Sequence, residues 1–378
     1  MKVAIAIDSF KGSMTSAEAG NAVAEGIRRV YPTADIAVRP VADGGEGTVA
    51  ALCEGLHGSY ADVYVTGPLG DKVCARYALV NGGKTAVMEM AAAAGLPLVP
   101  PDKRNPLLTT TYGVGEMIRH AIEHGCRDFI IGIGGSATND GGAGMLQALG
   151  FSFLRVDGTS ISAGAQGLGE LAVIHAENVP RVLSECRFRI ACDVTNPLCG
   201  GNGCSAVFGP QKGADESAVR VMERNLLHYA EITRALYPHA SSDLPGAGAA
   251  GGLGFAFSVF LRGELIRGID LIFSATDLDI YVQSADIVIT GEGKLDGQTV
   301  MGKAPAGIAA LAKKYGKPVI AFAGSVGNDA SLCHSCGIDA FFSIVRGPVS
   351  LDEAMYRENA ISNLANTAEQ VFRALNLW

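Results

Sequence analysis

The chain has 378 residues, of which 48% are apolar and 18% are charged. This length suits two domains that each bury a core, and the balance of residues excludes a disordered chain. The formal net charge of −8 argues against nucleic acid or an anionic membrane as the main partner, because neither would be attracted to such a surface.

The first residues, MKVAIAIDSF, predict a β-strand rather than a signal peptide, because the apolar run is short and lacks a cleavage pattern. No apolar stretch approaches membrane-spanning length. A zinc site needs a close cysteine pair joined to a second such pair or to suitably spaced histidines, and the nine cysteines show neither combination. We therefore expect a cytoplasmic protein with scattered reduced thiols.

The N-terminal segment predicts two strand–loop–helix units. Val3–Asp8 is a continuous apolar run, typical of a parallel strand that is buried on both faces. A helix follows to about Val30, with Thr15 and Glu18 at the spacing of a capping box. A second strand is predicted at Ile36–Val41, again followed by a helix.

The pattern changes near Ser59, where alternating apolar and polar residues between turn signals predict antiparallel hairpins. Strand–loop–helix units return at Asp128–Ile133 and dominate the C-terminal part. We therefore predict an α/β fold with two domains. Residues 1–59 and 283–378 form a discontinuous Rossmann-like parallel-sheet domain, and residues 60–282 form an inserted mixed α/β domain.

In a doubly wound sheet, ligands bind where loops leave the carboxyl ends of the strands. The loop after the first strand offers Ser9 and Lys11, and the loop after the second offers Asp43. Neighbouring strands would bring these loops together, and a lysine among carboxylates suits an anionic substrate with Mg²⁺. Asp43 also suits the N-cap of the following helix.

The segment GIGGSATNDGGAG, residues 132–144, follows a predicted strand and opens a helix. Its glycines let backbone N–H groups face a phosphate, and the helix N-terminus adds positive potential. The candidate phosphate-binding residues are Gly134, Gly135, Ser136, Thr138, Gly141 and Gly142. Asp140 is a candidate ligand for Mg²⁺. A tight turn capped by Asn or Asp is the alternative, and the number of glycines favours a binding loop.

The segment GAGAAG, residues 246–251, matches the G-x-G-x-x-G pattern of dinucleotide-binding loops, but the residues before it do not predict a strand. Gly246, Gly248 and Gly251 are consistent with a close approach of the backbone to a nucleotide. They are equally consistent with a glycine-rich start of a helix.

A third glycine-rich segment, Gly291–Pro305, lies between a strand predicted at Asp286–Thr290 and a helix predicted at Ala306–Tyr315. Residues 297–303 spell G-x-x-x-x-G-K, but Ala304 stands where a P-loop needs Ser or Thr for magnesium. We therefore predict no Walker A loop. The charged residues of the segment are candidates for phosphate contacts, Lys294 and Lys303, and for metal binding, Glu292 and Asp296.

The segment ACDVTNP, residues 191–197, ends another predicted strand. An aspartate at a strand end can accept the proton of an attacking hydroxyl, which makes Asp193 the candidate general base. Asn196 and Lys212 are candidates for substrate binding. An Asx turn before Pro197 is the other explanation of Asn196.

Taken together and in order, these segments resemble the bacterial glycerate kinase family of the short, two-domain type. The resemblance spans nearly the whole chain, so it is much more specific than any single motif. The matching stretches are DSFKGSMTSAEA, PVADGGEGT, VTGPLG, EMAAAAGLPLVP, IIGIGGSATNDGGAGMLQALG, ACDVTNPL, FGPQKGA, LPGAGAAGGLG, VITGEGKLDGQT and GKAP.

The resemblance implies phosphorylation of glycerate that depends on ATP and Mg²⁺, commonly at the 2-hydroxyl, with the active site in the cleft between two domains. From the chemistry of the loops, the glycine-rich backbone would hold the ATP phosphates, and Lys294 or Lys303 would neutralise developing charge. Lys11 would bind the glycerate carboxylate, and Asp193 would act as the base. Mg²⁺ would be held by carboxylates drawn from Asp43, Asp140, Asp193, Glu292 and Asp296.

Two other classes of protein share some of these features. The G-x-G-x-x-G/A strings are also found in dinucleotide-dependent oxidoreductases, and a regulatory protein without turnover could bind a nucleotide through similar loops. The acidic and lysine side chains at the strand ends disfavour the regulatory protein. We expect glycerate and ATP as ligands, no nucleic acid or membrane partner, and a monomer or homodimer. The sequence leaves open the product, 2- or 3-phosphoglycerate, and the preference for D- or L-glycerate.

Overall fold

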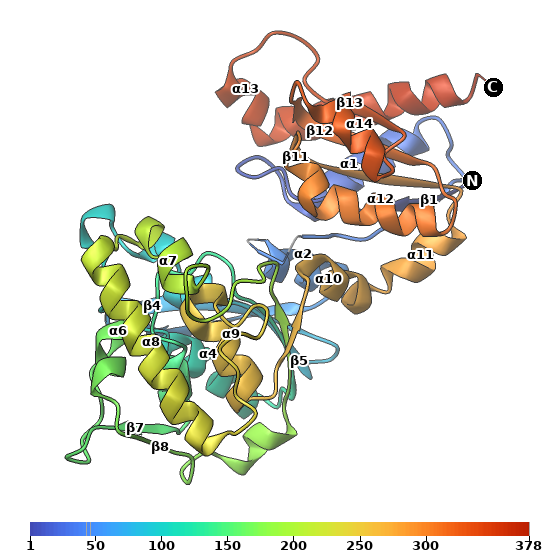
Figure 1. Cartoon of the computed structure of the whole chain (residues 1–378). Coiled ribbons are helices and arrows are strands. Elements are labelled where there is room, and N and C mark those ends of the chain that lie inside the picture. Colours follow the sequence, from blue (N-terminus) through green and yellow to red (C-terminus); the bar gives the residue numbers. More distant parts are fainter. Residues whose placement is uncertain (43, 46, 378) are drawn as a thin grey trace. The chain divides into compact units, whose positions relative to one another are not determined.

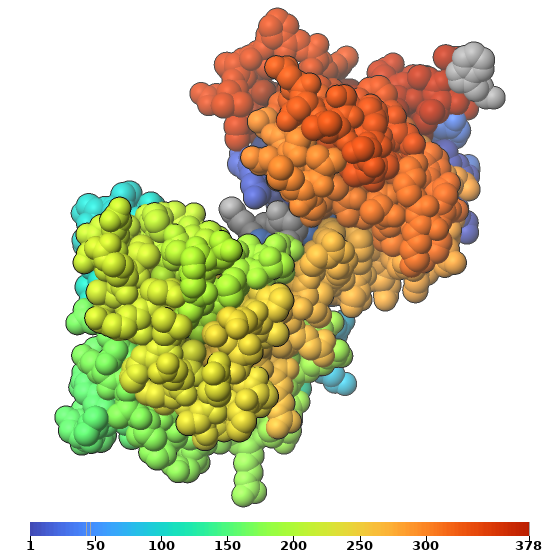
Figure 2. Space-filling model, in the orientation of Figure 1, coloured from blue at the N-terminus to red at the C-terminus, as the bar shows by residue number. Residues whose placement is uncertain are grey.

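The computed structural model describes the whole chain except residues 43, 46 and 378. The described residues form two compact units (Figure 1). Unit 1 comprises Met1–Asp43, Ala50–His57 and Ile269–Trp378, and unit 2 comprises Gly44–Val49 and Gly58–Gly268. Figure 2 shows the same division by colour, with both ends of the chain, blue and gold to red, in unit 1.

The sheets of the two units confirm the predicted fold class, a discontinuous Rossmann-like domain with an inserted mixed α/β domain. By their contacts, residues 269–282 belong to unit 1. The bounds of the inserted domain, residues 60–282, stay a prediction. In the described part of the chain, no helix is both long and apolar enough to cross a bilayer.

Unit 1 contains a five-stranded sheet in the order β13-β12-β11-β1-β2, and all its strand pairs are parallel. Helices α1 and α14 pack together on one face, and α11 and α12 pack together on the other (Figure 1). The strands are β1 (Lys2–Ile5), β2 (Asp35–Val38), β11 (Ile287–Leu295), β12 (Val319–Val326) and β13 (Ala340–Ser343). The helices are α1 (Ser16–Arg28), α10 (Gly268–Thr276), α11 (Leu278–Ser284), α12 (Ala304–Lys314), α13 (Leu351–Met355) and α14 (Arg357–Leu375).

Helix α1 shows how local sequence starts an element of unit 1. The Thr15 hydroxyl accepts a hydrogen bond from the Glu18 N–H at 3.2 Å, and the Glu18 carboxylate accepts one from the Thr15 N–H at 2.8 Å. This reciprocal pair satisfies two N–H groups that a helix start leaves open, so the predicted capping box is confirmed.

Strand β11 is longer than the sequence predicted. The prediction ended it at Thr290, but residues 291–295 continue as a strand because they pair in register with Phe322–Val326 of β12. Gly291 permits this pairing, since a Cβ there would lie 2.1 Å from the Phe322 carbonyl oxygen. Part of the predicted glycine-rich loop is therefore held rigidly in the sheet.

Unit 2 contains a six-stranded sheet in the order β10-β9-β6-β5-β4-β3. Strands β5, β6, β9 and β10 are parallel, whereas β3, β4 and β5 are joined as antiparallel hairpins, which confirms the predicted change of pattern. The strands are β3 (Ser59–Thr66), β4 (Lys72–Val80), β5 (Thr85–Glu89), β6 (Asp128–Gly132), β9 (Arg187–Ala191) and β10 (Glu264–Ile266), with a separate pair, β7 (Ser152–Leu154) and β8 (Val173–His175).

The main helices of unit 2 pack on a core that is rich in aromatic side chains, such as the stacked Phe129 and Phe188, whose ring centroids lie 4.9 Å apart. The helices are α3 (Ala91–Ala94), α4 (Tyr112–Glu123), α5 (Ala143–Ala148), α6 (Gly164–Gly167), α7 (Cys204–Phe208), α8 (Glu216–Leu236) and α9 (Ala249–Phe260). Helix α2 (Thr48–Gly55) contributes residues to both units.

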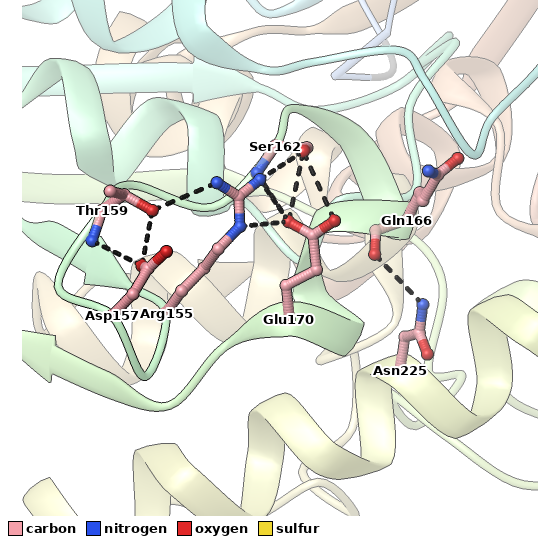
Figure 3. Close-up of polar contacts among 7 residues, drawn as sticks. All are labelled: Arg155, Asp157, Thr159, Ser162, Gln166, Glu170 and Asn225. Atoms are coloured by element: carbon pink, nitrogen blue, oxygen red, sulfur yellow. Dashed lines mark hydrogen bonds and ion pairs between the residues drawn. The ribbon is translucent and has the colours of Figure 1, made fainter.

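A polar network fixes the connection between β7 and β8 (Figure 3). The Arg155 guanidinium donates to Glu170 at 2.8 Å and to the Ser162 hydroxyl at 2.8 Å. Asp157 accepts from the N–H and the hydroxyl of Thr159 in the same turn. Because these groups are satisfied by their neighbours, we assign them a structural role.

Candidate functional site

The carboxyl ends of β1 and β11 border a cavity of about 590 Å³ in unit 1. Strand β1 lies between β2 and β11, so the chain leaves β1 toward one side of the sheet and leaves β11 toward the other. Such a switch point is where doubly wound sheets bind ligands. We call this space the switch-point cavity. Its charged lining residues are Asp8, Lys11, Glu292, Lys294 and Lys303.

Two nearly buried carboxylates lie near the carboxyl ends of these strands. Asp8 is 8% exposed and Glu292 is 7% exposed. The Asp8 N–H donates to the Gly291 carbonyl at 2.9 Å, so Asp8, just beyond the end of β1, lies beside the part of β11 that carries Glu292. Glu292 also accepts a hydrogen bond from the Thr299 hydroxyl at 2.5 Å.

This donor set fits Mg²⁺, which usually takes one or two protein carboxylates together with water and substrate phosphates. A metal site made by protein ligands alone would instead gather several such side chains. Within the described residues, no group of three or more His, Cys, Asp or Glu side chains could hold a metal ion. The pair Asp8 and Glu292 therefore suits a metal that arrives with a phosphate ligand.

Three lysines supply positive charge to the switch-point cavity. Lys11 follows β1, Lys294 lies near the end of β11, and Lys303 is the N-cap residue of α12. The N-terminus of α12 adds partial positive charge at the same place. The predicted phosphate contacts Lys294 and Lys303 thus line one cavity, together with Ser9.

Asp296, a predicted metal ligand, is engaged by its neighbours. Its carboxylate lies 2.9 Å from the Lys294 ammonium and accepts the Gln298 N–H at 2.9 Å. The hydrogen bond from Lys294 lowers the pKa of Asp296, and the same bond raises the pKa of Lys294. Asp8 and Glu292 line the switch-point cavity and Asp296 does not, so the geometry favours those two over Asp296 for holding a metal.

One part of the cavity wall is mainly apolar. It is formed by the segment that follows β13 and by α13, through Ile344, Val345, Val349, Leu351 and Met355. An apolar wall beside three lysines suits a ligand that carries a flat apolar ring at one end and phosphates at the other. Pockets of a few hundred cubic ångströms are the size that such ligands occupy.

In unit 2, the carboxyl ends of four parallel strands lie at one edge of the sheet. The register pairs Glu89 of β5 with Gly132 of β6, Gly132 with Ala191 of β9, and Ala191 with Ile266 of β10. The residues just beyond these positions therefore gather at this edge. They include Gly134–Ser136 after β6, Asp193 after β9 and Arg267 after β10.

Asp193, the predicted base, is exposed at this edge. One carboxylate oxygen, Oδ1, accepts a hydrogen bond from the Gly268 N–H at 2.9 Å, which holds the side chain against the end of β10. The arrangement orients a carboxylate toward solvent, as a base that meets a small substrate requires.

Most of the predicted loop of residues 132–144 is buried, and only Gly134 and Gly135 are exposed. Thr138, Asp140, Gly141 and Gly142 lie inside the unit. A phosphate or carboxylate would therefore approach the loop at Gly134 and Gly135, next to the nearly buried Ser136.

Asp140, a predicted metal ligand, organises this loop from within. Its carboxylate accepts hydrogen bonds from the Thr111 N–H and hydroxyl, both at 2.8 Å, and from the N–H groups of Gly142 and Gly144 at 3.2 and 3.3 Å. Burial raises the pKa of Asp140, and the hydrogen bonds from Thr111 oppose that shift. These contacts favour a structural role.

The GAGAAG segment packs against the same loop. The Gly141 N–H donates to the Gly251 carbonyl at 2.9 Å, and a Cβ on Gly251 would lie 2.1 Å from the Thr138 carbonyl oxygen. A Cβ on Gly248 would lie 2.1 Å from the Pro197 carbonyl oxygen, and Gly246 is also buried. The close approach that these glycines permit is between backbone segments of the protein.

Replacing Gly251 by alanine is therefore expected to lower the free energy of unfolding by about 2–5 kcal/mol, from steric overlap together with left-handed strain at φ +69°. Thermal or urea unfolding measures the loss. Gly158→Ala is the matched control, because Gly158 has φ +80° with nothing within 4 Å of its Cβ position, so only the strain of about 1 kcal/mol applies. Equal losses in the two variants would contradict the packing role.

The two predicted substrate-binding residues of this unit are also tied to the loops. The Asn196 side chain donates to the Asn202 carbonyl at 2.9 Å, inside its own loop. Lys212 is 2% exposed, and its ammonium donates to the Ser136 hydroxyl at 2.8 Å and the Thr138 carbonyl at 2.6 Å. Asp43, another predicted substrate-binding residue, lies outside the described residues.

Three residues at the strand ends escaped the sequence analysis. Asp8 was placed within the first strand, although a charged residue that ends an apolar run was the available signal. Glu89 accepts the Val49 N–H at 3.0 Å, and Arg267 directly follows β10. Strand β10 is only three residues long, which is why its sequence gave no strand signal.

Comparison with known proteins gives consistent results. The glycerate kinase family matches residues 3–376. The glycerate kinase of Bacillus subtilis is 48% identical over 377 residues, covering 100% of this chain and 98% of that protein. The glycerate 2-kinase of Escherichia coli is 47% identical over 375 residues, covering 99% and 98%. A crystal structure from Salmonella typhimurium LT2, assigned as a glycerate kinase 2, has a TM-score of 0.92 at 46% identity and covers 100% of this chain and 98% of its own.

Proposed function

The chain belongs to the glycerate kinase family, and on this premise we propose that it transfers the γ-phosphoryl group of ATP to the 2-hydroxyl of glycerate. The products are 2-phosphoglycerate and ADP. The choice of the 2-hydroxyl is supported by the Escherichia coli relative, which is named a glycerate 2-kinase. The cytoplasmic location and the monomeric or dimeric state stay predictions.

The switch-point cavity is the observation that carries the proposal for ATP. It combines an apolar wall for the adenine with Lys11, Lys294 and Lys303 for the phosphates. Lysine ammonium groups act on phosphate oxygens as point charges. Lys11, predicted from sequence to bind the glycerate carboxylate, lines this cavity, and we propose it as a third phosphate contact.

Asp8 and Glu292 would hold Mg²⁺ beside the phosphates. An ion bound there would supply charge neutralisation to the phosphates of ATP. The role of the protein is to fix the two carboxylates, and the hydrogen bond from Thr299 to Glu292 does this from the protein side. The backbone of Glu292 is held rigidly, because residues 291–295 pair with β12 in the sheet.

Glycerate is assigned to the strand ends of unit 2. The exposed Gly134 and Gly135 would present backbone donors for its carboxylate, the nearly buried Ser136 beside them would add a hydroxyl donor, and Asp193 would accept the proton of the 2-hydroxyl. The 2-oxygen then bonds to the γ-phosphorus as the bond to the β-phosphate oxygen breaks, and ADP leaves with that electron pair. Positioning and charge neutralisation supply most of the acceleration in such reactions.

A coupled assay of ADP release tests the proposal. Purified protein should release ADP from ATP only when glycerate and Mg²⁺ are both present, and ATP with Mg²⁺ should raise the thermal unfolding temperature, because a ligand that binds the native state stabilises it. NAD(H) should not raise it. Stabilisation by NAD(H) without glycerate-dependent ADP release would favour the oxidoreductase class and contradict the proposal.

A further inference from the structure

Lys212 is a buried cation within reach of the proposed glycerate site. It ends the short 3₁₀ helix Pro210–Lys212, is 2% exposed, and directs its ammonium at the underside of the turn that contains Ser136. Taking a lysine ammonium out of water costs free energy, so a buried lysine is found only where hydrogen-bond partners offset that cost. The partners here are the Ser136 hydroxyl and the Thr138 carbonyl, at 2.8 and 2.6 Å.

The hydrogen bond from Lys212 determines what Ser136 can do. A hydroxyl has one proton to donate and can accept two hydrogen bonds. Because the ammonium can only donate, Ser136 Oγ must be the acceptor in this pair, and its own proton is left for another partner. Among the described residues, no group accepts a hydrogen bond from Ser136 Oγ. Ser136 directly follows the exposed Gly134 and Gly135.

We infer that Lys212 is a positioning residue that fixes the Ser136 hydroxyl as a hydrogen-bond donor to the carboxylate of glycerate. The inference rests on the proposed function and adds a residue that acts without touching the substrate. A charged donor to Oγ also polarises the hydroxyl, which strengthens the hydrogen bond that it makes to an anion. We assign the carboxylate rather than the ATP phosphates because the phosphate-binding lysines lie in the switch-point cavity.

The charge state of Lys212 provides a signature of this arrangement. Burial lowers the pKa of Lys212 to about 8, while electrostatic interactions with Cys204 and Asp140, the two titratable groups that act on it, oppose the shift. Lys212 is thus charged below pH 8. Above that pH its neutral amine can accept the Ser136 proton, which reverses the hydrogen bond. Donation to glycerate is therefore expected to weaken as pH rises through about 8.

The experiment compares wild type with Ser136→Ala, Lys212→Met and the double variant. Each single change should raise the KM for glycerate by about 10- to 100-fold, the worth of a hydrogen bond to a charged group, and leave the KM for ATP unchanged. The double variant should resemble the single variants, because Lys212 acts through Ser136. Lys84→Met, an exposed lysine in the turn before β5 at the opposite end of the strands, is the control and should change neither constant.

The pH profile separates positioning from plain structural support. In wild type, kcat/KM for glycerate should fall as pH rises through about 8, and this fall should be absent in Ser136→Ala. That comparison stands even if Lys212→Met fails to fold in a thermal unfolding check. An unchanged glycerate KM in Ser136→Ala, additive effects in the double variant, or a rise in the KM for ATP instead would overturn the inference. Absence of glycerate-dependent ADP release in wild type would instead refute the proposed function.

Discussion

Replacing Asp193 by asparagine is expected to lower kcat for glycerate phosphorylation by about 10²- to 10⁴-fold, the contribution that a general base makes. The amide oxygen can still accept the Gly268 N–H, which Asp193 accepts at 2.9 Å, so the side chain keeps its place and loses its basicity. The KM values for ATP and glycerate should change little. Steady-state kinetics with both substrates varied measures the three constants.

Asp157→Asn is the matched control for this variant. Asp157 is also an exposed aspartate of unit 2, and it serves only the turn with Thr159 in the network of Figure 3. Its replacement should leave kcat within about twofold of wild type, as expected of a surface substitution that disturbs no site. Full kcat in a folded Asp193→Asn variant would show that another group takes the proton.

Replacing Glu292 by glutamine is expected to lower kcat by about 10²- to 10³-fold and to raise the Mg²⁺ concentration needed for half-maximal activity, since charge stabilisation by a bound metal is worth several kcal/mol. Glutamine keeps an oxygen that can accept the hydrogen bond of the Thr299 hydroxyl, which limits the disturbance of the fold. Initial rates measured over a Mg²⁺ titration, with a thermal unfolding check, report both effects.

Asp296→Asn is the informative comparison, because the sequence predicted both carboxylates as metal ligands. Asp296 is engaged by Lys294 and by the Gln298 N–H, so its loss should alter the lysine's position and leave the Mg²⁺ dependence close to that of wild type. If Asp296→Asn shifts the Mg²⁺ titration while Glu292→Gln does not, the assignment of the metal to Glu292 is wrong.

Local signals in the sequence were sufficient where the structure is determined locally. The capping box of Thr15 and Glu18, the apolar run of β1 and the alternation in β3 and β4 each depend on near neighbours in the chain, and each was predicted. The end of β11 was not, because residues 291–295 become a strand only through pairing with β12. Propensity does not report such tertiary pairing.

The candidate site shows the same division. Residues in the loops that follow strands, such as Lys303 and Asp193, could be named because charged and glycine-rich loops follow apolar runs. The burial of Lys212 and Asp140 could not be predicted, because it depends on segments far apart in the sequence, as in the hydrogen bonds from Lys212 to Ser136 and from Thr111 to Asp140. Gly251 illustrates the limit of motifs, since the same glycine pattern serves close packing of two backbones.

Phosphorus NMR of the reaction product tests the central claim most directly. The purified protein, incubated with ATP, Mg²⁺ and glycerate, should produce ADP and the resonance of 2-phosphoglycerate, assigned by addition of authentic 2- and 3-phosphoglycerate. A product that coincides with 3-phosphoglycerate would contradict the choice of hydroxyl. The absence of any glycerate-dependent phosphate ester would contradict the assignment of the enzyme itself.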